Sequence, residues 1–204
     1  MITHDVEQGS PAWIGLRLGL PTASCFDRII TPTGKPSTQA DAYANTLIAE
    51  WLTGIPGGIE ANGWMQRGTD MEPEACAWYE MDRGVEVSTV GLITDDDMRW
   101  GCSPDRLVGS SGLLEVKVPA PHTHVGYLLG GSLPGKYKPQ VQGQLWIAER
   151  EWCDFLSYHE AMPPLLVRVE RDDTYIKAME DELARFVESL ERKKQTLLAR
   201  GIAA

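Results

Sequence analysis

The amino-acid sequence predicts an α/β fold of the α+β kind, with a small mixed β-sheet flanked by helices. Two observations lead to this prediction. Apolar residues recur at helical spacing in the first third of the chain and again near its end, where residues 174–199 carry a continuous apolar stripe. Over residues 85–118 the pattern changes to short apolar runs separated by polar turns, which is typical of strands. A length of 204 residues favours one domain, residues 1–204.

Helices are predicted on both sides of this sheet. Thr22 provides an N-cap for a short first helix, and Gly54 and Gly84 follow the next two as C-terminal stops. Pro73 fits the first turn of the third helix, and Pro139 begins the fourth after a glycine-rich loop. In chain order the predicted helices are residues 22–30, 39–53, 70–83, 139–148 and 174–199.

Strands are predicted where apolar residues alternate or form short runs. Residues 106–108 and 113–118 form a hairpin around a glycine- and serine-rich loop. Prolines after residue 118 are expected to end that strand, which leaves His122 and His124 in a loop, and two histidines without a third ligand predict no metal site. The other predicted strands are residues 85–93, 155–158 and 165–169, with a polar turn at 95–97.

Composition excludes several classes of protein. No apolar run approaches the ~20 residues that cross a bilayer, and the N-terminus lacks the basic and apolar segments of a signal peptide, so we expect a cytoplasmic protein with no membrane contact. The four cysteines lie far apart without a CxxC pair, which favours buried free thiols over a zinc site, an iron–sulfur cluster or a disulfide framework.

The distribution of charge is more informative than the net charge of -10, which by itself disfavours a nucleic-acid partner. Residues 116–148 contain no Asp or Glu but include Lys117, Lys136 and Lys138. Residues 170–191 hold eight acidic and three basic residues, as expected of a solvated helix face. The segment after residue 116 is therefore a local electropositive region, although such a window also arises by chance.

The predicted hairpin carries the residues that indicate chemistry. Side chains alternate along a strand, so Glu115 and Lys117 share one face. Asp105 joins them across the hairpin only if the loop centres on Ser110, and a loop centred between Ser110 and Ser111 turns it away. We therefore expect a loop of odd length or a bulge. Two adjacent carboxylates repel unless a cation neutralises them, and Mg²⁺ favours carboxylate and carbonyl oxygens.

The segments around this hairpin resemble a known group of enzymes. Pro104-Asp105 followed by Glu115-Val116-Lys117 resembles the signature of the PD-(D/E)xK nucleases. Residues 13–24, 102–105 and 140–146 are similar, in order, to lambda-type phage exonucleases, the alkaline exonuclease or YqaJ-like viral recombinase family of that superfamily. The resemblance covers about residues 8–175 and implies a restriction-endonuclease-like core.

This resemblance implies a metal centre. Asp105, Glu115, Glu72 and the backbone carbonyl of Val116 would hold two Mg²⁺ ions, for which Mn²⁺ would substitute. Lys117 would orient and activate the attacking water. A separate interpretation of Glu72 is that it merely complements the helix dipole ahead of Pro73.

The resemblance also implies contacts with DNA. Arg17 would bind a terminal 5′-phosphate, Ser24 and Ser103 would help to hold the strand, and Gln142 would be the site glutamine. Relatives often have Tyr at the position of Gly143, so packing of this helix is expected to differ. As alternatives, Arg17 would stack on its neighbour Trp13 at the surface, and the glutamines would form an exposed helix face.

The resemblance implies a Mg²⁺-dependent 5′-to-3′ exonuclease that degrades one strand of linear double-stranded DNA from a 5′-phosphorylated end and leaves 3′ single strands for recombination. It further implies a ring-shaped homotrimer, a single-strand annealing protein as partner, and a phage or prophage gene in a bacterial host. The alternatives are a structure-specific endonuclease or repair nuclease of the same superfamily, and a DNA-binding ring module without catalysis.

Overall fold

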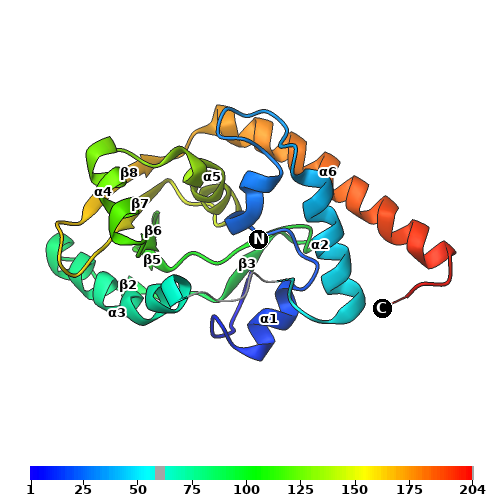
Figure 1. Cartoon of the computed structure of the whole chain (residues 1–204), viewed down its shortest axis with the longest axis horizontal. Coiled ribbons are helices and arrows are strands. Elements are labelled where there is room, and N and C mark those ends of the chain that lie inside the picture. Colours follow the sequence, from blue (N-terminus) through cyan, green and yellow to red (C-terminus); the bar gives the residue numbers. More distant parts are fainter. Residues whose placement is uncertain (58–62, 204) are drawn as a thin grey trace.

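The computed structural model describes residues 1–57 and 63–203, and within these ranges the side chains of all but 63–66 and 69. A five-stranded sheet with strand order β2-β5-β6-β7-β8 forms its centre (Figure 1). Strands β6 and β7 are parallel and the other pairs antiparallel, so the predicted mixed sheet is confirmed. The strands are β2 (Val87–Ser88), β5 (Arg106–Val108), β6 (Gly112–Lys117), β7 (Trp152–Ser157) and β8 (Leu165–Glu170).

A second, three-stranded antiparallel sheet has the order β1-β3-β4. Its first strand was not expected from the sequence, because Ile2 to His4 is too short to show a period and gains its hydrogen bonds only from β3. The predicted strand over residues 85–93 is instead divided between the two sheets. The strands of the second sheet are β1 (Ile2–His4), β3 (Leu92–Thr94) and β4 (Gly101–Cys102).

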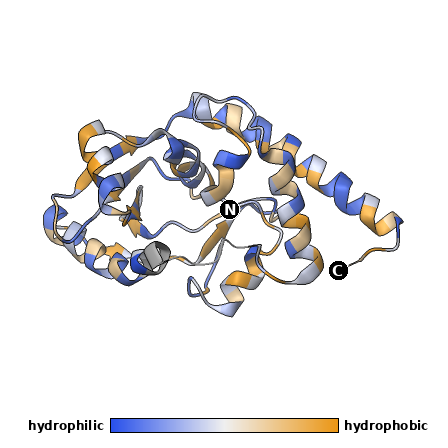
Figure 2. Cartoon of the chain, viewed as in Figure 1, coloured by the Kyte–Doolittle hydropathy of each residue, from blue (hydrophilic) through white to orange (hydrophobic). Residues whose placement is uncertain are grey.

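Helices cover both faces of the larger sheet. The long helix α3 packs on one face, while α5 packs on the other together with the short 3-10 helix η1 and the C-terminal helix α6 (Figure 1). Polar and apolar residues alternate along α6, as its buried stripe requires (Figure 2). The helices are α1 (Pro11–Arg17), η1 (Ala23–Arg28), α2 (Ala40–Thr53), α3 (Gly63–Arg83), α4 (Pro121–Gly130), η2 (Gly135–Tyr137), α5 (Lys138–Ile147) and α6 (Asp173–Ala199).

Two helix predictions need correction. Helix α3 begins at Gly63 rather than at residue 70, which places Pro73 inside the helix. His122 and His124 lie in helix α4, not in a loop, because Pro121 occupies the first turn of that helix. His124 is fully buried and hydrogen-bonded to Ser157 Oγ (2.7 Å), a structural role. Among the described residues, no helix is long and apolar enough to cross a membrane.

Two apolar cores lie on the two faces of strand β6. Leu113 belongs to the larger core with α5 and α6, whereas Leu114 and Val116 belong to the smaller core with α3. Both faces of the strand are therefore buried, including the face on which the sequence had placed Glu115 and Lys117. Glu115 lies on the face toward α5 and is 1% exposed, so a carboxylate is enclosed where an apolar residue would be expected.

A glycine determines how closely η1 approaches α5. A Cβ atom at Gly143 would lie 2.6 Å from the ring of Phe26, so the absence of a side chain at position 143 allows this ring to contact the helix. This contact explains why a tyrosine does not fit at position 143 of this chain. The start of η1, with Thr22 and Ser24, also lies close to β4 at the edge of the smaller sheet, where Thr22 forms a bridge with Gly101.

Candidate active site

The hairpin between β5 and β6 places Asp105 opposite Glu115. Arg106 pairs with Leu114 and Val108 with Gly112, so the loop has three residues and centres on Ser110. Gly109 begins the loop with φ at +56°, a backbone conformation that glycine adopts without strain. The prediction of an odd-length loop is therefore confirmed.

Asp105 is held by one hydrogen bond beside a second carboxylate. The backbone N–H of Val116 donates to its Oδ2 at 2.6 Å. Burial, followed by the nearby charge of Glu115, raises the pKa of Asp105 well above its usual value, and the ammonium of Lys117 only partly opposes this. The ionised form of Asp105 is thus unfavourable unless a further positive charge arrives.

Glu115 is surrounded by donors. Lys117 Nζ and Gln140 Nε2 donate to its Oε1, the latter at 2.6 Å, and Gln144 Nε2 donates to its Oε2 at 2.6 Å. Burial alone lowers the pKa of Lys117, but the charges of Glu115 and Asp105 outweigh it, and the net pKa is raised. Lys117 therefore stays an ammonium within the cluster.

The expectation for Gln142 is corrected by the phase of helix α5. Its amide donates to the Glu170 carbonyl (2.9 Å) and accepts from the backbone N–H of Asp172 (2.8 Å), so it ties the helix to the start of α6. Gln140 and Gln144 contact Glu115 instead. They are four residues apart and share a helix face, whereas Gln142 points about 200° away from Gln140. The spacing i, i+4 was the signal that could have identified them.

Glu72 lies near this cluster but is paired with another residue. Arg106 Nη1 donates to its carboxylate at 2.7 Å. Arg106 follows Asp105 directly, and strand alternation turns it toward α3, where Glu72 lies. Among the described residues, no group of three or more His, Cys, Asp or Glu is placed to hold a metal ion. The expected set of Asp105, Glu115 and Glu72 is therefore not assembled in this conformation.

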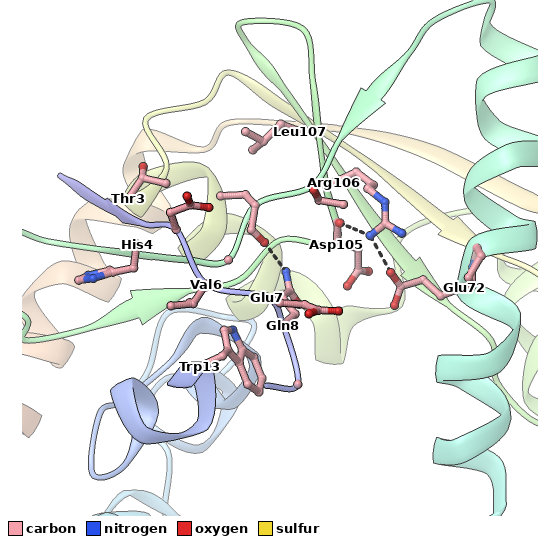
Figure 3. A pocket seen from close by; sticks show the side chains of 16 residues that line it. Thr3, His4, Val6, Glu7, Gln8, Trp13, Glu72, Asp105, Arg106 and Leu107 are labelled. Atoms are coloured by element: carbon pink, nitrogen blue, oxygen red, sulfur yellow. Dashed lines mark hydrogen bonds and ion pairs between the residues drawn. The ribbon is translucent and has the colours of Figure 1, made fainter. Parts of the chain in front are cut away.

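A cavity of about 950 Å³ opens beside Asp105, and Glu72, Arg106 and Trp13 also line it (Figure 3). The N-terminal segment forms one wall. Gln8 secures this wall, because its amide donates to the carbonyl oxygens of Val90 (2.8 Å) and Pro104 (2.9 Å). The cavity is of the size that small-molecule and nucleotide ligands occupy.

A second polar cluster gathers the three residues expected to hold a DNA strand. Arg17 donates to Ser103 Oγ and to Thr22 Oγ1, each at 3.3 Å, and its guanidinium lies 4.0 Å from the centre of the Trp13 ring. Trp13 Nε1 also donates to Ser103 Oγ at 3.0 Å. The exposed hydroxyl of Ser24 lies 3.2 Å from Thr22 Oγ1. Thr22 is the residue that sequence analysis missed, having been interpreted only as an N-cap.

Arg17 carries an uncompensated charge. Burial lowers its pKa, and within the described part of the chain no carboxylate forms an ion pair with it. A guanidinium fork beside hydroxyl donors matches the geometry of a phosphate group. The cluster is thus suited to bind an anion from outside the protein.

The carboxylate cluster is suited to a hard cation. Gln144 donates through its Nε2, while its Oε1 is buried without a hydrogen-bond partner among the described residues. An unpartnered amide oxygen and a pair of adjacent carboxylates are both stabilised by a divalent cation with a preference for oxygen ligands. The residues present therefore fit a Mg²⁺ ion.

The mixed sheet and the carboxylate–lysine hairpin define a nuclease. Residues 12–151 match the YqaJ-like viral recombinase domain, and the chain belongs to that family. The structure is similar to that of an alkaline exonuclease (LHK-Exo) from Laribacter hongkongensis, with a TM-score of 0.86 and 36% sequence identity over 94% of this chain and 98% of that one. LHK-Exo has also been solved in complex with dAMP, with the same similarity.

Two further comparisons give more distant similarities. A phage-related exonuclease from Haemophilus somnus 129PT shares the fold, with a TM-score of 0.71 at 15% identity over 87% of this chain and 96% of that one. An uncharacterized protein of Acanthamoeba polyphaga mimivirus is 27% identical over 170 residues, which is 74% of this chain. The chain spans only 29% of the length of that viral protein.

Proposed function

We propose that the protein is a Mg²⁺-dependent exonuclease that degrades one strand of linear double-stranded DNA in the 5′-to-3′ direction from a 5′-phosphorylated end. One observation carries this proposal. Ser103 belongs to the arginine cluster and Asp105 to the carboxylate cluster, and only Pro104 separates them. Their Cα atoms are at most about 8 Å apart. An anion site so close to a cleavage site suits a strand end held while its first linkage is cut.

Within this proposal, Asp105, Glu115 and the Val116 carbonyl hold the Mg²⁺ ions, of which family resemblance implies two, and Mn²⁺ substitutes for them. Glu72, which is paired with Arg106 in the structure, would supply a further carboxylate oxygen. Bound Mg²⁺ offsets charge on the scissile phosphate and lowers the pKa of a bound water. Each of these residues offers an oxygen ligand of the kind that Mg²⁺ prefers.

The remaining residues orient the attacking water, the Glu115 carboxylate and the DNA strand. Lys117 Nζ, which donates to Glu115, holds the attacking water at the edge of the carboxylate cluster. Gln140 and Gln144 keep the Glu115 carboxylate in one orientation. At the other cluster, Arg17 grips the terminal 5′-phosphate, and Ser103 and the exposed Ser24 donate further hydrogen bonds to the strand.

We extend the proposal to the biological setting. The product is a duplex with 3′ single strands that enters phage-type recombination, with a single-strand annealing protein as partner. The match to a viral recombinase domain supports this setting. The proposed assembly is a homotrimeric ring around DNA, in which the acid-free segment 116–148 would face the substrate despite the net charge of -10.

Linear and covalently closed circular duplexes test the proposal. With Mg²⁺, the linear 5′-phosphorylated duplex should be degraded and the closed circle should remain intact, and chelation of Mg²⁺ should stop degradation. Cutting of the circle at a comparable rate would overturn the exonuclease assignment in favour of an endonuclease.

End recognition is tested by replacing Arg17. Arg17→Ala should reduce degradation of the 5′-phosphorylated duplex by about 100-fold and leave the slower degradation of a 5′-hydroxyl duplex nearly unchanged, because only the phosphate uses the guanidinium fork. Ser24→Ala should cause a smaller loss on the 5′-phosphorylated duplex and, like Arg17→Ala, should leave degradation of the 5′-hydroxyl duplex nearly unchanged. Equal losses on both ends would mean that Arg17 does not bind the terminal phosphate.

A further inference from the structure

The ring of Tyr137 lies close to two lysines, one of which belongs to the carboxylate cluster. Lys117 Nζ is 5.4 Å from the ring centre and Lys136 Nζ is 4.8 Å from it. Tyr137 also packs against the fully buried Phe155, with ring centres 5.2 Å apart. The ring is therefore held firmly next to the cleavage site.

Tyr127 completes this group. Its hydroxyl lies 3.3 Å from the hydroxyl of Tyr137, the two rings meet edge to face, and Lys136 Nζ is also 5.6 Å from its ring centre. We call Tyr127, Lys136 and Tyr137 the tyrosine–lysine patch. It brings together α4 and η2, which lie on either side of a glycine-rich turn.

The charge of the patch is not balanced by the protein. Lys136 is exposed, and within the described residues it forms no ion pair with a carboxylate. No Asp or Glu occurs in residues 116–148, from which the patch is built. By contrast, the exposed Lys177 on α6 is paired with both Glu180 and Asp181.

We propose that the tyrosine–lysine patch is a phosphate-binding subsite, in which Lys136 contacts a phosphodiester of the strand being cut, on the 3′ side of the scissile linkage. This inference rests on the proposed exonuclease function and extends it beyond the end-binding cluster at Arg17. Two rings and the cation of Lys136 give the patch the components of single-strand recognition, which combines stacking surfaces with phosphate contacts.

Distances limit which phosphodiester is contacted. Lys117 and Lys136 lie within 5.4 Å of the same ring centre, so their ammonium groups are no more than about 11 Å apart. A strand rises by about 3.4 Å per nucleotide in duplex DNA, so Lys136 reaches a linkage within about three nucleotides of the one being cut. The contacted phosphodiester therefore lies among the first few from the 5′ end.

Removal of the Lys136 charge tests the inference. Lys136→Met keeps the apolar stem along the rings, Lys136→Arg keeps the charge, and Lys177→Met is the matched control on α6. Binding to a 5′-phosphorylated duplex is measured by fluorescence anisotropy in a chelating buffer, from about 50 to 200 mM salt, where phosphate contacts dominate the salt dependence. Thermal unfolding checks that each variant is folded.

Lys136→Met should bind about fivefold more weakly, and the slope of log K against log salt should decrease in magnitude by about 0.9, the value for one lost phosphate contact. Lys136→Arg and Lys177→Met should both match the wild type. A Lys136→Met protein with the salt dependence of Lys177→Met would overturn the inference.

A neutral methylphosphonate, placed in turn at each of the first linkages from the 5′ end, locates the contact. At one linkage it should weaken binding by the wild type but cause no further loss in Lys136→Met, because both changes remove the same interaction. Additive losses at every linkage would overturn the inference.

Cleavage by the wild type in Mg²⁺ is measured in parallel. If the wild type fails to cut linear duplex, the proposed function is overturned. If it cuts while Lys136→Met binds like the control, only the subsite is overturned.

Discussion

Two aspartates of the larger sheet and its border, the buried Asp154 and the partly buried Asp105, differ in how the protein treats their charge. Asp154, on β7, accepts hydrogen bonds from Tyr79 Oη (2.8 Å) and from Arg168 Nε and Nη2 (2.9 and 2.8 Å). Burial alone would raise the pKa of Asp154, but the hydrogen bonds from Arg168 and Tyr79 outweigh it and lower this pKa. The protein itself satisfies this carboxylate, whose role is structural.

Asp105, which directly precedes β5, has the opposite surroundings. It accepts one backbone hydrogen bond, lies beside the carboxylate of Glu115, and has a pKa that burial and Glu115 raise. A cation bound from outside the chain would stabilise its charge. The difference separates a carboxylate whose charge the protein itself neutralises from one whose charge it leaves largely unsatisfied, and such perturbed groups are common at active sites.

The largest expected difference between the two aspartates is in catalysis. Asp105→Asn should reduce Mg²⁺-dependent degradation of linear duplex by about 1000-fold or more, because it removes a proposed metal ligand. Asp154→Asn, measured at a temperature where it is folded, should stay within about twofold of the wild type, since the side chain of Asp154 is bonded to Tyr79 and Arg168, which lie outside the carboxylate cluster. Equal losses of activity in both variants would mean that Asp105 and Asp154 do not differ in their role in catalysis.

Stability should respond in the opposite sense. Asp154→Asn should lower the free energy of unfolding by about 2 kcal/mol, less than for a fully buried pair because half of the Arg168 side chain is exposed. Asp105→Asn should leave it unchanged or raise it by about 1 kcal/mol, because repulsion from Glu115 is removed. Urea unfolding in a chelating buffer measures both. A destabilised Asp105→Asn protein would mean that Asp105 is structural.

Mg²⁺ should stabilise the folded protein through Asp105 and not through Asp154. At tenfold the dissociation constant, a ligand that binds only the folded state raises the free energy of unfolding by about 1.4 kcal/mol. Wild type and Asp154→Asn should show this increase, and Asp105→Asn should show little. A normal response to Mg²⁺ in Asp105→Asn would place the cation elsewhere.

The smallest effect is the pH dependence of the Asp154 contribution. Because the folded pKa of Asp154 lies below its unfolded value of about 3.9, its stabilising effect is fully present above that value and is lost as pH falls through the folded pKa. The difference in unfolding free energy between wild type and Asp154→Asn should thus be constant from neutral pH to about pH 5 and shrink below about pH 4. A difference that grows on acidification would contradict the lowered pKa.

The sequence was sufficient for the features that depend on local periods. Strand alternation placed Glu115 and Lys117 on one face, and the loop centred on Ser110 set Asp105 opposite Glu115. The amphipathic stripe of α6 and the glycine that ends α2 were similarly visible. These features are determined by residues close together in the chain.

Features that depend on how helices and strands pack against one another could not be predicted from local periods in the sequence. The rotation of α5 about its axis decides whether Gln142 or the pair Gln140 and Gln144 meets Glu115, and that rotation is determined by packing against η1 and α6. The ion pair between Arg106 and Glu72 joins residues 34 positions apart. Tertiary contacts of this kind leave no local period in the sequence.

The central proposal is tested most directly by the order in which label leaves a linear duplex. One strand end carries a 5′ or a 3′ label on otherwise identical 5′-phosphorylated DNA, and digestion is followed with Mg²⁺ and with a chelator. With Mg²⁺, the 5′ label should be released at once as a mononucleotide, and the 3′ label only after the rest of the strand; with chelator, neither should be released. Early release of the 3′ label, or release of either label without a divalent cation, would contradict a 5′-to-3′ metal-dependent exonuclease.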